Sequence, residues 1–123
     1  MEGSKKRVLI ADDDPAILDV LTLFLEEVGY EVESTINPET IGEFSTGYPD
    51  LMILDIWMSG WNGLDICRTL KGQATTRQLP IILFSAKKEA EELAYEAGAD
   101  DFIAKPFNLD DMLDKVERFF KDS

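Results

Sequence analysis

The fold of this chain is constrained most by four short apolar runs, at residues 8–11, 51–54, 81–84 and 102–104. Each run is directly followed by a polar residue; in order these residues are Asp12, Asp55, Ser85 and Lys105. Strand-like runs of this length, separated by helix-like stretches, predict the parallel sheet of an α/β protein. Ligands of such sheets bind at the carboxyl ends of the strands. The pattern therefore predicts that these four side chains gather at one edge of the sheet.

Helix signals fill the segments between the runs. Asp14 can cap a helix that has Pro15 in its first position, and Gly29 suits the end of that helix. Apolar residues recur at helical spacing between these two ends. Residues 37–45 repeat the cap-plus-proline signal, which predicts a second helix.

The remaining segments complete the alternation of strands and helices. We expect an edge strand at residues 31–36, a loop at 55–62, and helices at 63–72, at 89–97 and from 108 onward. Five strands that alternate with five helices predict a flavodoxin-like, doubly wound (βα)5 fold with three layers. The expected order of the parallel sheet is 2-1-3-4-5.

Composition excludes several classes of function. The 123 residues predict a single domain over 1–123, with residues 1–6 as a disordered N-terminal segment. The formal charge of −13 argues against direct binding to nucleic acid, whose affinity depends on neutralised phosphates. No apolar run approaches the length of a signal peptide core or a membrane span, and Cys67 is the single cysteine, so a cytoplasmic location is expected. The chain has no histidine, which excludes a catalytic imidazole and a phosphohistidine of its own.

Three carboxylates are expected to lie together, because Asp12, Asp13 and Asp55 follow the first and third strands. Such a group needs either raised pKa values or a bound cation. Oxygen ligands without histidine or thiol favour Mg²⁺, with Mn²⁺ as the alternative ion. The structural alternative is that the aspartates at 12–14 only begin a helix and that Asp55 is a loop residue.

The lysine and the serine make a functional interpretation stronger. A divalent metal, an ammonium group and a hydroxyl around one aspartate are what phosphoryl transfer to a carboxylate requires. Lys105 and Ser85 would supply the ammonium and the hydroxyl. Each residue alone has an ordinary explanation, as an ion-pair partner or as a turn residue.

Four motifs of this chain resemble those of the receiver domains of two-component response regulators. They are VLIADDDPAIL at 8–18, DLMILDIWMSGWNGLD at 50–65, PIILFSA at 80–86 and GADDFIAKPF at 98–107. The resemblance covers essentially the whole chain, and it extends to the single-domain chemotaxis-type regulators.

The resemblance implies a role for each matching residue. It makes Asp55 the phosphoacceptor, Asp12 and Asp13 the acidic pair that holds Mg²⁺, and the backbone carbonyl of Trp57 a further metal ligand. Ser85 corresponds to the hydroxyl that moves toward the phosphoryl group, and Phe102 occupies the aromatic switch position. Lys105 matches the lysine of the site, and its bond to Pro106 resembles one that the family holds in cis.

Two departures from the family pattern affect these expectations. Ser59 stands where the family commonly has proline, which could loosen the loop that presents the Trp57 carbonyl. Phe102 replaces a common tyrosine, so burial of the ring alone would have to couple it to Ser85. The bulky Trp57 could either screen a phosphoryl group on Asp55 from water or only pack on its neighbours.

The resemblance implies a signalling phosphoacceptor that assists its own phosphorylation and dephosphorylation and is not a turnover enzyme. The phosphodonor would be a histidine kinase or a phosphotransfer protein. The output would be a downstream protein partner or a self-dimer, through the fourth helix, fifth strand and last helix. One alternative is a pseudo-receiver that only binds proteins. Another is a phosphatase of the haloacid dehalogenase type, but Trp57 stands where that class needs a second aspartate.

Overall fold

The computed structural model describes residues 5–36, 48–58 and 60–120. The main strands are β1 (Arg7–Ala11), β2 (Glu31–Thr35), β3 (Leu51–Asp55), β6 (Ile81–Ser85) and β7 (Asp101–Ala104). The helices are α1 (Pro15–Val28), α2 (Gly63–Lys71), α3 (Glu91–Glu96) and α4 (Leu109–Arg118), and η2 (Lys88–Ala90) is a 3₁₀ turn. Two short strands, β4 (Trp57–Met58) and β5 (Trp61–Asn62), complete the set.

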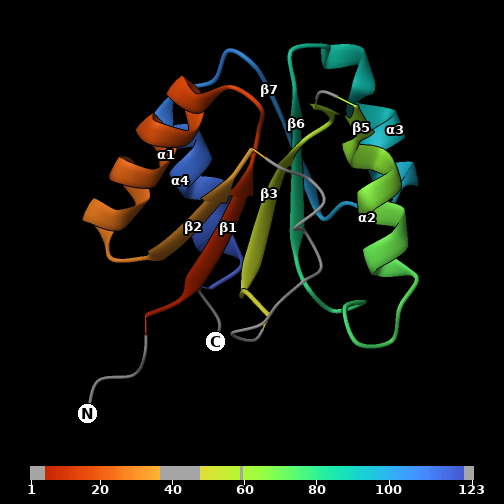
Figure 1. Cartoon of the computed structure of the whole chain (residues 1–123), viewed down its shortest axis with the longest axis horizontal. Coiled ribbons are helices and arrows are strands. Elements are labelled where there is room, and N and C mark those ends of the chain that lie inside the picture. The colour runs from red at the N-terminus through yellow and green to blue at the C-terminus, as the bar shows by residue number, and fades with distance from the viewer. Residues whose placement is uncertain (1–4, 37–47, 59, 121–123) are drawn as a thin grey trace.

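The five main strands form one parallel sheet in the order β2-β1-β3-β6-β7. Numbered along the chain without the two short strands, this is the predicted order 2-1-3-4-5. The sheet has helices on both faces, with α1 and α4 on one side and α2 and α3 on the other (Figure 1). The predicted three-layer, flavodoxin-like fold is confirmed.

Two apolar cores lie on the two faces of the sheet. Alternate residues of each central strand enter opposite cores, so β3 is buried along its whole length. On the α1 and α4 side, Leu21 and Val116 pack over Ile53, whereas Cys67 of α2 belongs to the other core with Leu54. Burial also raises the pKa of the Cys67 thiol to about 11, as expected for an apolar filler.

Side-chain caps begin α1 and α4. The Asp14 carboxylate accepts a hydrogen bond from the Ala16 amide at 3.0 Å, as the sequence predicted for a cap. Asn108 caps α4 in the same way, accepting from the Asp111 amide at 2.7 Å. The helix predicted at 37–45 lies outside the described residues. None of the described helices combines the length and the apolar character that a membrane span requires.

The prediction of a loop at residues 55–62 is wrong in part, because the structure has an antiparallel hairpin there. Trp57 pairs with Asn62, and Met58 pairs with Trp61. Strands of two residues are too short to produce a hydrophobic period, so the sequence pattern could not indicate them. The helix expected at 89–97 also differs, since it begins as the 3₁₀ turn η2 before continuing as α3.

An ion pair joins the end of α2 to Asp100, which directly precedes β7. Lys71 Nζ donates to Asp100 Oδ2 at 2.8 Å and to the carbonyl of Leu79 at 2.8 Å. The same Asp100 oxygen accepts from the Ile81 amide at 2.8 Å. These contacts tie α2 to the start of β6 at the sheet end opposite the predicted site.

Candidate functional site

The carboxyl ends of β1 and β3 place two carboxylates side by side. Ala11 pairs with Leu54 in the parallel register, so Asp12 and Asp55 leave the sheet at the same level. Asp12 has no exposed surface, and Asp55 is 5% exposed. Two buried carboxylates on neighbouring strand ends repel each other unless a cation or a proton compensates their charge.

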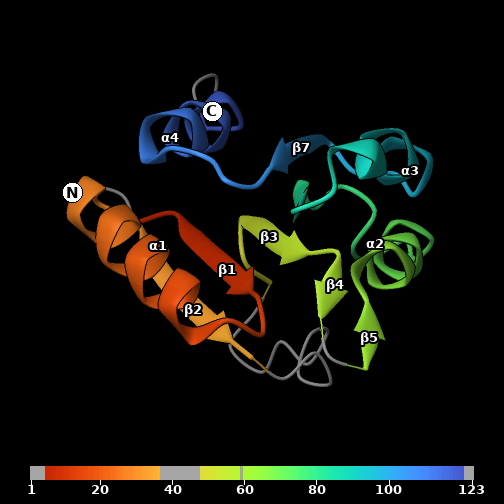
Figure 2. The ribbon, with the colours of Figure 1, turned by 90° about the horizontal axis from the view of Figure 1, so that it is seen from above.

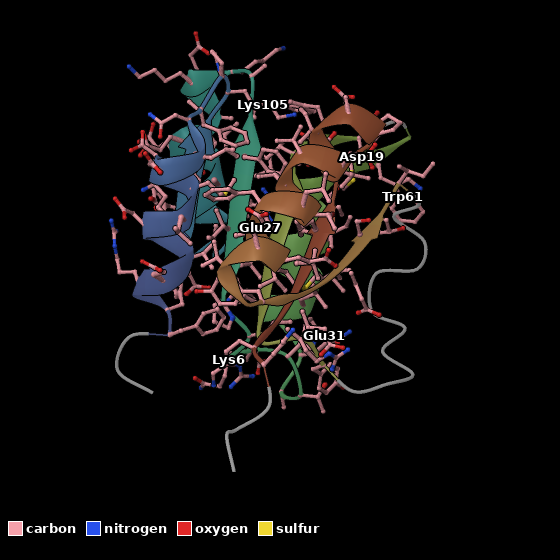
Figure 3. All side chains as sticks on the ribbon, turned by 90° about the vertical axis from the view of Figure 1, so that its left-hand side faces the viewer. Lys6, Asp19, Glu27, Glu31, Trp61 and Lys105 are labelled. Atoms are coloured by element: carbon pink, nitrogen blue, oxygen red, sulfur yellow. The ribbon has the colours of Figure 1, made fainter. Side chains whose placement is uncertain are left out.

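Lys105 brings a positive charge to both carboxylates from the end of β7. Its Nζ donates to Asp12 Oδ2 at 3.0 Å and lies 3.6 Å from Asp55 Oδ2. The ammonium also lies 4.6 Å from the centre of the Phe84 ring. Figure 3 shows Lys105 at one end of the sheet, with Lys6 and Glu31 at the opposite end. The bond from Lys105 to Pro106 is cis, as the resemblance implied.

The environment of Asp55 favours its protonated form. Burial, followed by the neighbouring Asp12 carboxylate, raises the pKa of Asp55 to about 6. The Lys105 ammonium and a hydrogen bond from the Trp57 amide to Asp55 Oδ1, at 3.3 Å, oppose this shift. A perturbed carboxyl among charged partners at a sheet edge is typical of a functional site.

Asp13 completes a group of three carboxylates. One oxygen each from Asp12, Asp13 and Asp55 can be chosen so that the three lie within 4.8 Å of one another. Asp13 is exposed, whereas the other two are buried, so the group is open on one side. Three carboxylate oxygens with an open side fit a hard divalent cation such as Mg²⁺, which keeps several water ligands. The excess of negative charge over the single ammonium supports the same fit.

Ser85 lies at the end of β6, and within the described residues its hydroxyl forms no hydrogen bond with Asp55. Its hydroxyl is buried and accepts a hydrogen bond from the Lys87 amide at 3.0 Å. Its carbonyl accepts from the Lys105 amide at 2.8 Å, which joins the ends of β6 and β7. Phe102 of β7 is 6% exposed and belongs to the core on the α2 and α3 side.

The β4–β5 hairpin begins two residues after Asp55. The Trp57 side chain is 45% exposed, and Lys87 Nζ lies 5.6 Å from the centre of its ring. Gly63 closes the hairpin against β3, because a Cβ atom there would lie 2.5 Å from the Asp55 carbonyl oxygen. Only glycine permits this approach.

One polar cluster next to the switch position was missed by the sequence interpretation. The buried Asp101 carboxylate accepts from Tyr95 of α3 at 3.2 Å and from Lys115 of α4 at 3.0 Å, and Arg118 Nη1 lies within 3.6 Å. It also accepts from the Phe102 amide at 2.8 Å. The sequence did contain a signal for this cluster. Lys115 and Arg118 are one helical turn apart, so both can face the aspartate at position 101, where the preceding strand begins.

The comparisons with known proteins agree with this geometry. The family model of the response regulator receiver domain matches residues 8–117. The DNA-binding response regulator MtrA of Mycolicibacterium smegmatis is 32% identical, over 94% of this chain and 51% of its own length. This chain therefore spans about half the length of the curated relatives it matches.

Solved structures show the same architecture. The response regulator TrrA of Thermotoga maritima, solved in complex with Mg²⁺-BeF, has a TM-score of 0.82 and is 35% identical, over 93% of this chain and 98% of that one. The chemotaxis response regulator CheY4 of Vibrio cholerae has a TM-score of 0.86 over 94% and 99% of the two chains; at 24% identity it supports the fold alone.

The fold and the family match over residues 8–117 define a receiver domain. This chain belongs to the response regulator receiver domain family. Members of this family are signalling phosphoacceptors of two-component systems, not turnover enzymes of the usual kind. They bind Mg²⁺ at an acidic pocket and interact with histidine kinases and downstream effectors.

Proposed function

We propose that this chain accepts a phosphoryl group onto Asp55 from the phosphohistidine of a histidine kinase or phosphotransfer protein, in a reaction that depends on Mg²⁺. The observation that carries the proposal is that Asp55 lies beside the carboxylates of Asp12 and Asp13 and 3.6 Å from the ammonium of Lys105. The Lys105 ammonium, together with a cation held by the three carboxylates, would neutralise the phosphoryl oxygens while Asp55 acts as the nucleophile toward phosphorus.

The chemical step is an in-line displacement. An Asp55 carboxylate oxygen attacks the phosphorus atom, the nitrogen–phosphorus bond of the donor breaks, and the imidazole leaves with the electron pair and takes up a proton. The product is a mixed anhydride of aspartate and phosphate. Asp55 must be ionised to attack; although its pKa is raised to about 6, most of the carboxyl groups are ionised at neutral pH.

The neighbouring residues balance the charge of this step. Lys105, already 3.6 Å from Asp55, would pair with an oxygen of the incoming phosphoryl group. Asp12 and Asp13 would hold Mg²⁺ together with Asp55 and the Trp57 carbonyl. The ion would supply positive charge to the phosphoryl oxygens during transfer.

The output would follow from Ser85 and Phe102. Movement of the Ser85 hydroxyl toward the phosphoryl group breaks its hydrogen bond with the Lys87 amide. That amide belongs to the segment that leads into η2 and α3, so the population of α3 positions would shift on phosphorylation. The ring of Phe102, packed in the core on the α3 side, would follow this shift.

The donor would dock beside Lys105. A cavity of about 690 Å³ lies between α1 and the segment after β7, and Lys105 lines it together with Ile17, Val20 and Phe107. Val20 is 51% exposed, so an apolar surface adjoins the reactive carboxylate. The 123 residues contain no histidine, so the donor must be another protein or another segment. A cytoplasmic location and a single receiver domain over residues 1–123 stay predictions.

The test is phosphorylation by a small donor, followed by intact mass. With Mg²⁺ and acetyl phosphate, we expect the protein to gain the mass of one phosphoryl group and the fluorescence of Trp57 to change. Asp55→Asn should remove the gain, and the matched variant Asp65→Asn, on exposed α2, should keep it. Absence of a gain in the native chain favours the pseudo-receiver, and rapid turnover of acetyl phosphate favours a phosphatase.

A separate measurement tests the docking surface. Val20→Asp should slow transfer from a protein phosphodonor but leave the reaction with acetyl phosphate unchanged. Equal rates with the protein donor would refute the docking surface without affecting the role of Asp55.

A further inference from the structure

Two residues hold the side chains at the neighbouring ends of β3 and β6. Asp55 pairs with Phe84 in the sheet, so Asp55 and Ser85 end adjacent strands. Trp57, two residues after Asp55, donates its amide to Asp55 Oδ1 at 3.3 Å. Lys87, two residues after Ser85, donates its amide to the Ser85 hydroxyl at 3.0 Å. The carboxylate and the buried hydroxyl are thus each held by the backbone just beyond their own strand.

The side chains of Trp57 and Lys87 also contact each other. Lys87 Nζ lies 5.6 Å from the centre of the Trp57 ring, within the reach of a cation–π contact. No carboxylate of the described residues forms an ion pair with Lys87, so none competes with the ring for the ammonium. Figure 2 shows the hairpin of β4 and β5 continuing beyond the end of β3, beside α2. The contact therefore joins this hairpin to the segment between β6 and η2.

Together these contacts form a continuous path from the carboxylate to the hydroxyl. The path runs through Asp55, Trp57, Lys87 and Ser85, by two amide hydrogen bonds and one contact between side chains. The Lys87 carbonyl also accepts from the Ala90 amide at 3.0 Å, which fixes Lys87 to η2. The position of Lys87 is therefore set by the hydroxyl, by the ring and by the start of η2.

Phosphorylation would disturb both hydrogen bonds of this path. A phosphoryl group on Asp55 takes up an oxygen of the carboxylate, and movement of Ser85 toward that group breaks its bond with the Lys87 amide. The segment that begins η2 would then be free to shift, which carries Lys87 Nζ away from the Trp57 ring. An interaction that is present in only one of two states favours that state. The contact between ring and ammonium would thus favour the unphosphorylated arrangement.

We propose that the contact between Trp57 and Lys87 is a latch, which holds the hairpin to the segment after β6 while Asp55 is unphosphorylated. The latch favours the state in which the Ser85 hydroxyl stays bonded to the Lys87 amide. Opening the latch makes it easier for Ser85 to move toward a phosphoryl group. This inference rests on the proposed function and adds to it a residue pair that sets how readily the switch operates.

Four variants of the full chain separate the latch from a general effect of charge. Lys87→Met removes the ammonium and keeps the length of the side chain, whereas Lys87→Arg keeps a cation that can lie over the ring. Lys88→Met is the matched control, because Lys88 is the adjacent exposed lysine and its loss changes the net charge equally. Trp57→Leu removes the ring without changing the charge.

The first measurement needs no phosphodonor. Amide hydrogen exchange at position 87 reports how often the hydrogen bond to Ser85 opens. Lys87→Met and Trp57→Leu should each lower the protection factor there by about two- to fivefold, the change expected from loss of an exposed cation–π contact. Lys87→Arg and Lys88→Met should keep the native protection. Native protection in Lys87→Met, or an equal loss in Lys88→Met, would overturn the latch.

A double variant tests whether the two side chains act through each other. One contact can be lost only once, so Lys87→Met combined with Trp57→Leu should lower the protection no further than either substitution alone. Losses that multiply would show that the two residues act separately, and they would overturn the proposal. The ε-methylene protons of Lys87 should also resonate upfield in the native chain because of the ring, and Trp57→Leu should abolish that shift. Unshifted protons in the native chain would contradict the contact itself.

Phosphorylation gives an independent measurement of the same latch. Trp57→Leu decides it, because Lys87→Met also removes a positive charge that attracts an anionic donor. With Mg²⁺ and acetyl phosphate, Trp57→Leu should gain the phosphoryl group about two- to fivefold faster than the native chain, as initial rates by intact mass. An unchanged or slower rate would refute the coupling of the latch to the switch. A native chain that gains no mass refutes the role of Asp55 instead, while the exchange data still test the latch.

Discussion

The ammonium of Lys105 lies 3.0 Å from the fully buried carboxylate of Asp12 and within 3.6 Å of Asp55. One ammonium group is thus shared by two buried carboxylates, and Asp13 adds a third carboxylate at the exposed side of the group. The site is left short of positive charge. Buried charge that is not fully compensated lowers the free energy of unfolding, so the chemistry of this site is expected to reduce stability until a cation binds.

The first prediction concerns stability without metal. The pKa of Asp55 is raised from 3.8 to about 6 in the folded protein, so the fold binds a proton more tightly than the unfolded chain. Stability should therefore fall as pH rises from about 4 to about 6, with the full penalty present above pH 6. Asp55→Asn removes this penalty, which is about 3 kcal/mol at pH 8 for a pKa raised from 3.8 to about 6. Urea unfolding at pH 4 and pH 8 measures it.

The control for this prediction is Asp65→Asn, whose side chain is 74% exposed on α2. It should change the free energy of unfolding by less than about 0.5 kcal/mol at either pH. The prediction fails if Asp55→Asn gains no more stability at pH 8 than at pH 4.

The second prediction concerns metal binding. Mg²⁺ should raise the melting temperature of the native chain, because an ion bound only by the folded state stabilises it, by about 1.4 kcal/mol at ten times its Kd. Asp13→Asn should lose most of this effect, since it removes the exposed carboxylate of the group. Asp14→Asn is the matched control, because asparagine also caps a helix. Equal responses of the two variants to Mg²⁺ would contradict the metal assignment.

The third prediction concerns the closure of the hairpin. In Gly63→Ala the added methyl group would lie 2.5 Å from the Asp55 carbonyl oxygen and 2.9 Å from the Cα atom of Ile56. The backbone must move, at an expected cost of about 1–3 kcal/mol in the free energy of unfolding. Because one of the displaced atoms is the carbonyl oxygen of Asp55, phosphorylation by acetyl phosphate should also slow. An unchanged urea midpoint would show that the hairpin adjusts freely.

The fourth prediction concerns the lifetime of the phosphorylated form. The ring of Trp57 is exposed, with Lys87 Nζ 5.6 Å from its centre, and we expect it to screen a phosphoryl group on Asp55 from water. Trp57→Asn should expose this group to water and shorten the half-life several times, as followed by intact mass after the phosphodonor is removed. Trp61→Phe, on the other strand of the hairpin, should keep the native half-life. If Trp57 only packs on its neighbours, both variants will behave alike.

The convergence of the site could be predicted from the sequence because it depends on topology. Parallel strands place their carboxyl ends together, so Asp12, Asp55 and Lys105 had to meet once the strands were identified. The strand boundaries were predicted to within one residue, and the caps at Asp14 and Asn108 were recognised from the residue types alone.

Features that depend on tertiary contacts could not be predicted in this way. The hydroxyl of Ser85 accepts a hydrogen bond from the Lys87 amide. The sequence pattern placed Ser85 at the end of its strand but could not predict which group its hydroxyl would bind. The carboxylate of Asp101 collects groups from α3 and α4, although strand periodicity alone gives no reason for a buried acid there. The β4–β5 hairpin was not predicted, because its two-residue strands are too short to show a hydrophobic pattern.

The pair formed by Lys71 and Asp100 has a consequence for how this protein can vary. It fastens the amino ends of β6 and β7, whereas the reacting groups occupy the carboxyl ends of the same sheet. Substitutions of Lys71 or Asp100 are therefore expected to change the free energy of unfolding without touching the reacting groups. Substitutions at the carboxyl ends of the strands change stability and reactivity together, because the buried charges there contribute to both.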